Sequence, residues 1–186
     1  MNTPICDFVH NYTEKEGLRL HMPGHKGCCQ TGPEKYDITE IEGADALYEA
    51  KGIIAESEKN AGKLFGCNTF YSTEGSSQCI RAMLYLAVIH ARQNGKKPLI
   101  LAARNVHKAF VSAAVLLDFD YTWIYPQNDA SYLSCKINGE ILEKYLCSVN
   151  KMPTALYLTS PDYLGNVSDI ESVSAVCKKL GILLIV

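Results

Sequence analysis

The stretch TFYSTEGSS, residues 69–77, decides the fold class because a strand-like run passes directly into a long helical pattern. The run 67–71 is predicted to be a strand, and the apolar spacing over 76–93 predicts a helix. The first N–H groups of such a helix lack partners within the helix and lie at its positive dipole end. With the hydroxyls of Ser76 and Ser77 they suit a phosphate, although Gly-Ser-Ser is also an ordinary helix N-cap.

Strand-like and helix-like segments alternate through the rest of the sequence. Strands are predicted at 98–103, 121–125, 154–159 and 182–186, and further helices at 53–65, 106–117, 139–149 and 169–180, with a polar, turn-like segment at 127–138. This alternation is typical of parallel β-α-β units, so we expect an α/β domain with helices on both faces of a mostly parallel sheet. Loops 72–77, 104–108 and 160–165 then follow strand ends and converge on one crevice.

The first fifty residues differ from this pattern. An amphipathic stretch at 5–14 leads into a loop rich in Gly and Pro and then a mixed acidic segment. We therefore predict an N-terminal arm over residues 1–52 and the first part of a large domain over 53–186. The apolar run 182–186 is typical of a central parallel strand, and because the sequence stops inside it we interpret the chain as a fragment.

The composition excludes several classes of protein. Of the 186 residues 47% are apolar and the formal charge is −2, which argues against disorder and against a nucleic-acid surface. The eight cysteines form no paired Cys-x-x-Cys motifs, so no metal site is expected. Cys79, Cys147 and Cys177 fall in apolar helical patterns and are expected in the core. Neither a secretory signal nor a membrane span is visible, which favours a cytoplasmic location.

Several short motifs are specific in combination. The sequence carries PGHKG at 23–27, DITE at 37–40, GADAL at 43–47 and, after the Gly-Ser-Ser turn, RNVHK at 104–108. Together they resemble the Orn/Lys/Arg decarboxylase family of pyridoxal-phosphate enzymes, which have fold type I, the aspartate-aminotransferase-like fold. The resemblance runs from about residue 18 to residue 186, that is, over the arm and the first part of the family's large domain.

The resemblance implies a cofactor-binding role for several residues. Gly75, Ser76 and Ser77 match the turn that holds the cofactor phosphate. His107 matches the histidine that stacks on the pyridine ring. Ser160, Tyr163 and Gly165 match the strand-end loop that borders the cofactor.

Two positions depart from the family's pattern, and three others remain open. Asp162 stands where a small hydroxylated residue is expected, and Tyr48 stands where a histidine is more typical. His25 and Lys26 are candidates for acid–base chemistry or for a purely structural turn. Asp45 is a candidate for function or for a local helix cap.

The family's catalytic residues lie beyond these motifs. The resemblance implies an aspartate directly after a strand like 182–186, in an Asp-x-Ala-His pattern, and later a Schiff-base lysine after Ser/Thr-x-His. Residues 1–186 contain neither, and Lys108 is no substitute because no Ser/Thr-x-His precedes it. No catalytic residue is therefore assigned, and the chain alone is expected to be inactive and not to retain pyridoxal phosphate.

The implied activity is decarboxylation of a basic amino acid, namely lysine, arginine or ornithine, to an amine and carbon dioxide. The alternatives are another fold-type-I enzyme, such as an aminotransferase or a lyase, or a non-catalytic truncated remnant that binds a partner. We expect a homodimer or higher homo-oligomer, also because an incomplete sheet leaves an open strand edge. Neither a nucleic acid nor a membrane is expected as a partner.

Overall fold

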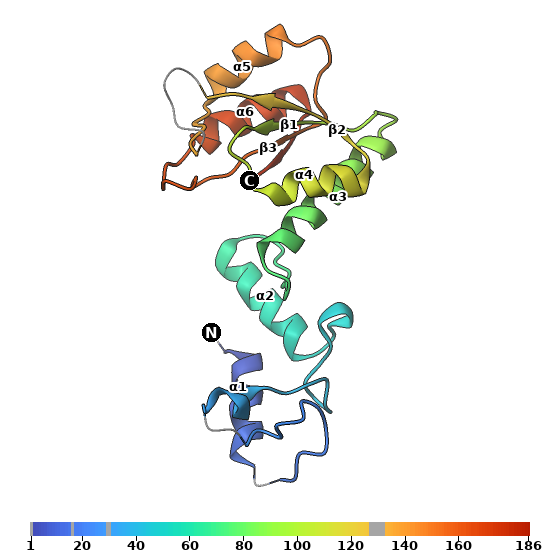
Figure 1. Cartoon of the computed structure of the whole chain (residues 1–186), viewed down its shortest axis with the longest axis vertical. Coiled ribbons are helices and arrows are strands. Elements are labelled where there is room, and N and C mark those ends of the chain that lie inside the picture. The colour runs from blue at the N-terminus through green and yellow to red at the C-terminus, as the bar shows by residue number, and fades with distance from the viewer. Residues whose placement is uncertain (1, 16, 29–30, 127–132) are drawn as a thin grey trace. The chain divides into compact units, whose positions relative to one another are not determined.

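A computed structural model describes residues 2–15, 17–28, 31–126 and 133–186. The chain forms two compact units, Met1–Thr73 and Glu74–Val186, each of which is considered by itself (Figure 1). The predicted helix 53–65 belongs to the first unit together with the arm. The division after residue 52 that the sequence suggests remains a prediction.

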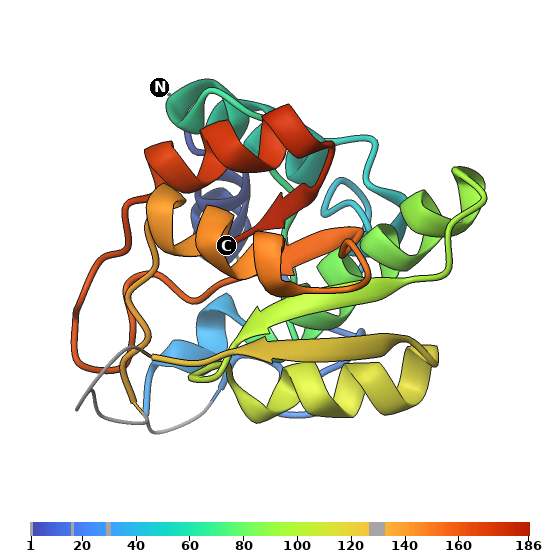
Figure 2. The same ribbon diagram turned by 90° about the horizontal axis from the view of Figure 1, so that it is seen from above.

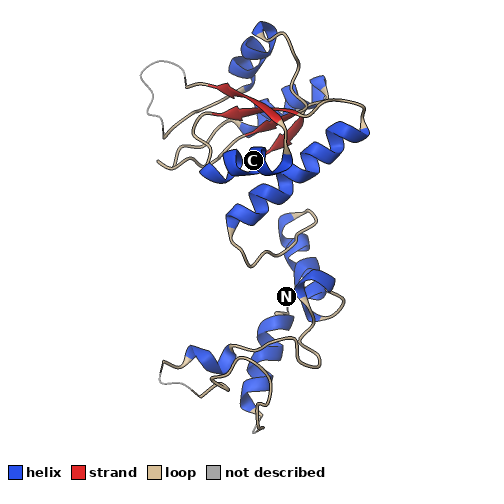
Figure 3. Cartoon of the chain, turned by 45° about the vertical axis from the view of Figure 1, so that its right-hand side comes forward, coloured by secondary structure: helices blue, strands red, loops and turns tan. Residues whose placement is uncertain are grey.

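The second unit is built on a parallel sheet, shown in red in Figure 3. In the described residues its strand order is β2-β1-β3-β4. The strands are β1 (Leu99–Ala103), β2 (Asp120–Ile124), β3 (Ala155–Tyr157) and β4 (Leu183–Ile185). Since β1 pairs with β3 through Ala102 and Tyr157, the loops that follow these two strands lie at the same sheet edge.

Helices cover both faces of this sheet, as the alternating pattern predicts (Figures 1 and 2). Helices α3 (Ser76–Gln93) and α4 (Lys108–Leu117) pack on one face, and α5 (Gly139–Ser148) and α6 (Ile170–Leu180) pack on the other. Alternate residues of β1 divide between the two layers: Ile100 and Ala102 face α3 and α4, and Leu101 and Ala103 face α5 and α6. The expected α/β fold class is confirmed.

An aromatic cluster fills the layer beneath α4. Phe110 is completely buried, and its ring centroid lies 5.3–5.8 Å from the rings of Phe119, Tyr121, Trp123 and Tyr157. These partners come from β2, its approach and β3, so one side chain of α4 joins two strands of the sheet.

The first unit is mainly helical. It contains α1 (Pro4–Glu14), the 3₁₀ turns η1 (Pro33–Tyr36) and η2 (Leu47–Glu49), and α2 (Ile53–Phe65). Helix α2 has its predicted bounds and ends at Gly66, whose φ of 69° is left-handed. Its buried Asn60 donates from Nδ2 to Oδ1 of Asn2 at 2.9 Å, which ties α2 to the residues before α1.

The predicted strand at 67–71 is wrong, because this segment packs on α2 instead of pairing with a strand. The Cys67 N–H donates to the Gly62 carbonyl at 3.1 Å, and the Tyr71 N–H donates to the Glu58 carboxylate at 2.8 Å. Phe70, in the middle of this segment, is 79% exposed. The loop 72–77 therefore does not follow a strand, contrary to the expectation.

Cysteine burial also differs in part from the prediction. Cys177 is buried in the core beneath α6, as expected, but Cys79 and Cys147 are exposed on α3 and α5. Both lie on the outer faces of their helices, so their small apolar side chains do not contribute to the core. In the described ranges, no helix combines the length and apolarity needed to cross a membrane.

Candidate functional site

The start of α3 presents unused hydrogen-bonding groups. Gly75, the N-cap, has φ 68° and ψ −171°, and a Cβ placed on it would meet no atom within 4 Å. Having no side chain, it leaves the first N–H groups of α3 without a cap. The hydroxyls of Ser76 and Ser77 make no hydrogen bond to any described residue. Open space, free N–H groups and two hydroxyls at a positive helix end fit a phosphate.

Charge near this turn is balanced by a local ion pair. The Arg81 guanidinium donates to Glu74 at 3.1 Å and to the Gln78 side chain at 2.8 Å. The carboxylate that precedes Gly75 is therefore neutralised by a cation one turn into α3. An anion at the helix start thus faces less repulsion than an unpaired Glu74 would cause.

The length of α3 carries its first turn toward the carboxyl ends of the strands. A short turn after Gln93 leads into β1, so α3 runs opposite to β1 on the sheet face that it covers. The 18 residues of α3 span about 27 Å, whereas the five residues of β1 span about 16 Å. The first residue of α3 buried in the core is Ile80, so the turn at Gly75 projects beyond the packed layer.

His107 caps the next helix. Its Nδ1 accepts the Ala109 N–H at 3.2 Å, and the residue is otherwise exposed at the start of α4. Since Nδ1 is an acceptor, the neutral ring carries its proton on Nε2. The structural and functional interpretations of His107 are therefore compatible, because the cap bond also fixes the ring.

The loop that contains His107 also includes Arg104 and Asn105, and no separate pattern in the sequence indicates a role for Asn105. Arg104 donates its N–H to the Ile124 carbonyl at 3.0 Å, and its guanidinium lies 5.3 Å from the Trp123 ring centroid. Next to it, both polar atoms of the Asn105 amide are buried and have no hydrogen-bond partner among the described residues. The only sequence signal was its place in the RNVHK motif, which does not reveal an unpaired amide.

The loop after β3 is held by Asp162. Its Oδ1 accepts the N–H of Leu164 at 2.9 Å and that of Asn166 at 2.8 Å. The side-chain hydrogen bond from Ser134, followed by those from Asn166 and the Leu164 N–H, lowers the pKa of Asp162 to about 2. The acidic residue that departs from the family's pattern is thus an internal brace of the loop.

This braced loop presents two of the predicted site residues. Ser160 accepts the Ser168 N–H at 3.1 Å through its hydroxyl, so that oxygen has a structural partner. The Tyr163 side chain is 87% exposed. Gly165 has φ 80° and donates its N–H to the Asp162 carbonyl at 2.9 Å, which closes the turn behind Tyr163.

Strand pairing brings two of the three loops to one edge of the sheet, and the third leads into α3. Loops 104–108 and 160–165 follow the adjacent strands β1 and β3, and α3 packs on α4 beside them. The sequence-predicted residues Gly75, Ser76, Ser77, His107, Ser160 and Tyr163 all belong to the second unit. Their contact with a cofactor stays a prediction.

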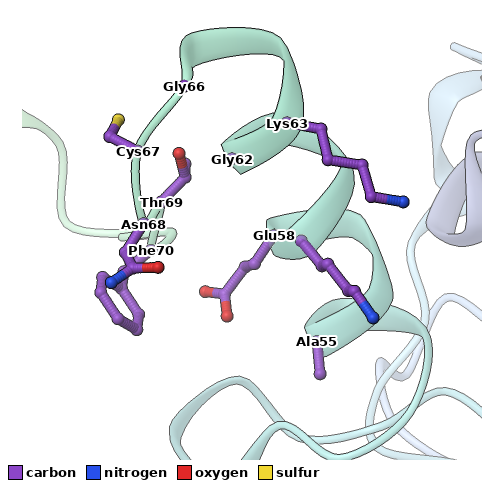
Figure 4. Close-up of a pocket in the computed structure, with 10 residues that line it drawn as sticks. Ala55, Glu58, Gly62, Lys63, Gly66, Cys67, Asn68, Thr69 and Phe70 are labelled. Carbon is purple, nitrogen blue, oxygen red and sulfur yellow. The ribbon is translucent and has the colours of Figure 1, made fainter.

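A hollow in the first unit has a different character. It has a volume of about 640 Å³ and lies between α2 and the segment 67–70 (Figure 4). Glu58 points into it, but this carboxylate already accepts the Tyr71 N–H. A Cβ on Gly62 would lie 2.7 Å from the Cys67 carbonyl oxygen, so close backbone packing shapes one wall. None of the predicted site residues lines this hollow.

The motifs of the arm make contacts within their own unit. His25 accepts the Gly27 N–H at Nδ1, 3.0 Å away, and contacts Asp37 through Nε2 at 3.2 Å. The Lys26 ammonium donates to the His21 carbonyl. These bonds are those of a structural turn, and in the described residues no cluster of His, Cys, Asp and Glu could hold a metal.

Asp45 caps α2. Its Oδ2 accepts the N–H of Gly52 at 2.8 Å and that of Ile54 at 3.0 Å, and Oδ1 accepts those of Ala46 and Lys51 at 3.0 Å. The hydrogen bond from Lys51, followed by those from Gly52, Ala46 and Ile54, lowers its pKa to about 2. This geometry favours the local-cap interpretation of Asp45.

We expect Asp45→Asn to destabilise the start of α2 near neutral pH. Asparagine tolerates the left-handed φ of 66° at this position, but only one of its side-chain atoms accepts. Because the folded pKa is depressed, the carboxylate stabilises the fold above the unfolded value of about 4, and the benefit is lost as the pH falls toward about 2. The difference in amide exchange of Gly52 and Ile54 between wild type and variant should therefore shrink between pH 4 and pH 2.

Glu42→Gln, at an exposed position of the same segment, is the matched control and should leave these amides unchanged. A difference between wild type and Asp45→Asn that stays constant over this pH range would contradict the role given to the carboxylate.

The comparisons with known proteins identify the family. The model of the Orn/Lys/Arg decarboxylase major domain matches residues 3–186, and the chain therefore belongs to this family. An arginine decarboxylase of Bacillus subtilis (strain 168) is 29% identical over 184 residues, which are 92% of this chain and 36% of that protein. An arginine decarboxylase of Halalkalibacterium halodurans is 28% identical over 94% of this chain and 37% of its own length. The chain thus spans little more than a third of these relatives.

Solved structures show the same fold. The constitutive lysine decarboxylase of Escherichia coli aligns with a TM-score of 0.56 at 17% identity, over 87% of this chain and 25% of its own. Mouse CSAD aligns with a TM-score of 0.54 at 18% identity, over 70% of this chain and 30% of its own. The sheet and its helices match part of the large domain of fold-type-I pyridoxal-phosphate enzymes.

Proposed function

We propose that this chain is the N-terminal part of a pyridoxal-phosphate-dependent decarboxylase of a basic amino acid, namely lysine, arginine or ornithine. Membership of the decarboxylase family supports the class of reaction. The observation that carries the proposal is the open start of α3, where the N–H groups and hydroxyls of Ser76 and Ser77 have no partner among the described residues. This start belongs to the same unit as the loops of His107 and Tyr163.

The residues present fit the cofactor in kind. Gly75, Ser76 and Ser77 would hold its phosphate, His107 would cover the ring, and Ser160 and Tyr163 would border it. When bound, pyridoxal phosphate supplies the electron sink that accepts the electron pair left when carbon dioxide departs.

The chain's own residues fix the geometry of this site. The cap bond to Ala109 holds the His107 ring by Nδ1, which leaves its face for stacking. Asp162 braces the loop that carries Tyr163. The Arg81–Glu74 pair keeps a negative charge from opposing the phosphate.

We further propose that the 186-residue chain alone is inactive and does not retain the cofactor, because it would bind it only weakly and reversibly. The lysine that would attach pyridoxal phosphate covalently, and the aspartate that would hold the proton on its ring nitrogen, have no match in this sequence. The active form is a homodimer or larger homo-oligomer that includes these residues.

The test compares this chain with a version extended through the family's aspartate and lysine. We expect only the extended form to acquire the visible absorbance of lysine-bound pyridoxal phosphate and to release carbon dioxide from at least one of the three amino acids. A folded, cofactor-bound extended form that releases no carbon dioxide from any of them would overturn the proposal.

Two alternatives are distinguished by the same assay. The fold alone does not fix the reaction, since a SepCysS–SepCysE N-terminal domain complex aligns with a TM-score of 0.55, close to the 0.56 of the lysine decarboxylase. A keto acid product instead of an amine would indicate an aminotransferase. A folded extended form with no cofactor absorbance would favour a non-catalytic partner-binding remnant.

A further inference from the structure

The Asn105 side chain is polar, buried and unpaired. Neither its Oδ1 nor its Nδ2 has a hydrogen-bond partner in the described structure, although the residue as a whole is partly exposed. A buried amide without partners loses its hydrogen bonds to water and gains none in return, so it destabilises the fold. An apolar side chain of similar size would avoid this cost.

The position of Asn105 gives this cost a functional explanation. It lies at the carboxyl end of β1, two residues after Ala103 and two before His107. The neighbouring backbone is fixed, because Arg104 donates to the Ile124 carbonyl and Val106 donates to that of Ala103. The side chain is therefore the part of this turn that is left to accept a hydrogen-bond partner.

We infer that the Asn105 amide is a binding residue for a polar substituent on the ring of the cofactor. This inference rests on the proposed function. The amide both donates and accepts, so it matches a ring hydroxyl or its oxyanion. The phosphate already has the free N–H groups and hydroxyls at the start of α3, and the ring face is assigned to His107. A partner from the cofactor removes the cost of the unpaired amide only in the bound state.

The test uses Asn105→Leu in the 186-residue chain and two probes. Pyridoxine 5′-phosphate carries the ring and phosphate but no aldehyde, so it cannot react with surface lysines. Inorganic phosphate probes the α3 turn alone. Binding is followed by NMR titration of the Ser76 and Ser77 amides and of the Asn105 side-chain amide, and stability is followed by Tm without ligand.

We expect Asn105→Leu to raise the Tm of the free chain. Its affinity for pyridoxine 5′-phosphate should fall on the order of tenfold, the equivalent of one lost hydrogen bond. Its affinity for inorganic phosphate should not change. Asn94→Leu is the matched control, because Asn94 donates to the His90 carbonyl at 2.7 Å at the opposite end of α3. That variant should not raise the Tm and should bind both probes as the wild type does.

A lower Tm for Asn105→Leu, or undiminished affinity for pyridoxine 5′-phosphate, would overturn the inference while leaving the proposed function intact. Failure of the wild type to bind either probe at millimolar concentration would count against the proposed function itself, and the inference would fall with it.

Discussion

Replacing Phe110 with alanine is expected to lower the free energy of unfolding of the second unit by about 3–5 kcal/mol, the usual cost of truncating a buried phenylalanine. The side chain is 0% exposed and contacts four aromatic rings, so its removal opens a cavity between α4 and the sheet. The chain's single tryptophan, Trp123, is one of these partners, and its fluorescence in a urea titration reports unfolding of this layer.

Val115→Ala is the matched control on the same helix. Val115 is 81% exposed, so its truncation should change the unfolding free energy by no more than about 0.5 kcal/mol. If Phe110→Ala does not fold, Phe110→Leu gives a smaller loss with the same sign. A loss below about 1 kcal/mol for Phe110→Ala would show that α4 does not anchor this layer.

The helices of the chain could be predicted because their signals are local. The predicted bounds of α2 and α3 agree with the structure, and each helix ends where the adjoining residues end the apolar pattern. The prediction of a strand at 67–71 is wrong because a strand needs a partner strand. No local pattern shows that the Tyr71 N–H donates to the Glu58 carboxylate instead. Pairing is a non-local property, which a pattern of apolar residues does not encode.

The candidate site shows the same limit. The sequence predicts Gly75 as a site residue from the helix start and His107 from the RNVHK motif. In the structure both residues are helix N-caps. The lowered pKa of Asp162 depends first on Ser134, 28 positions earlier in the sequence, so residue type alone suggested only a departure from the family. Whether the Asn105 amide has a hydrogen-bond partner depends on all the atoms that surround it in the fold, so no sequence pattern indicates it.

Replacing Gly75 with alanine is expected to weaken phosphate binding at α3 by about tenfold or more. The combination of φ 68° and ψ −171° is essentially restricted to glycine, and forcing another residue into it costs about 1–3 kcal/mol. No atom obstructs a Cβ at this position, so the cost is conformational and not steric. The backbone relieves it by leaving this conformation, and this redirects the N–H groups of Ser76 and Ser77 that the phosphate would use.

Gly95→Ala separates strain from function. Gly95 also has a left-handed φ, 66°, and open space around its Cα, but it follows the carboxyl end of α3. Both variants should therefore lose stability, whereas only Gly75→Ala should lose the shifts of the Ser76 and Ser77 amides on titration with inorganic phosphate. Equal phosphate affinity in the two variants would mean that the glycine only shapes the helix start. Selective loss in Gly75→Ala would show that the strained conformation is retained because it aims the first turn of α3 at an anion.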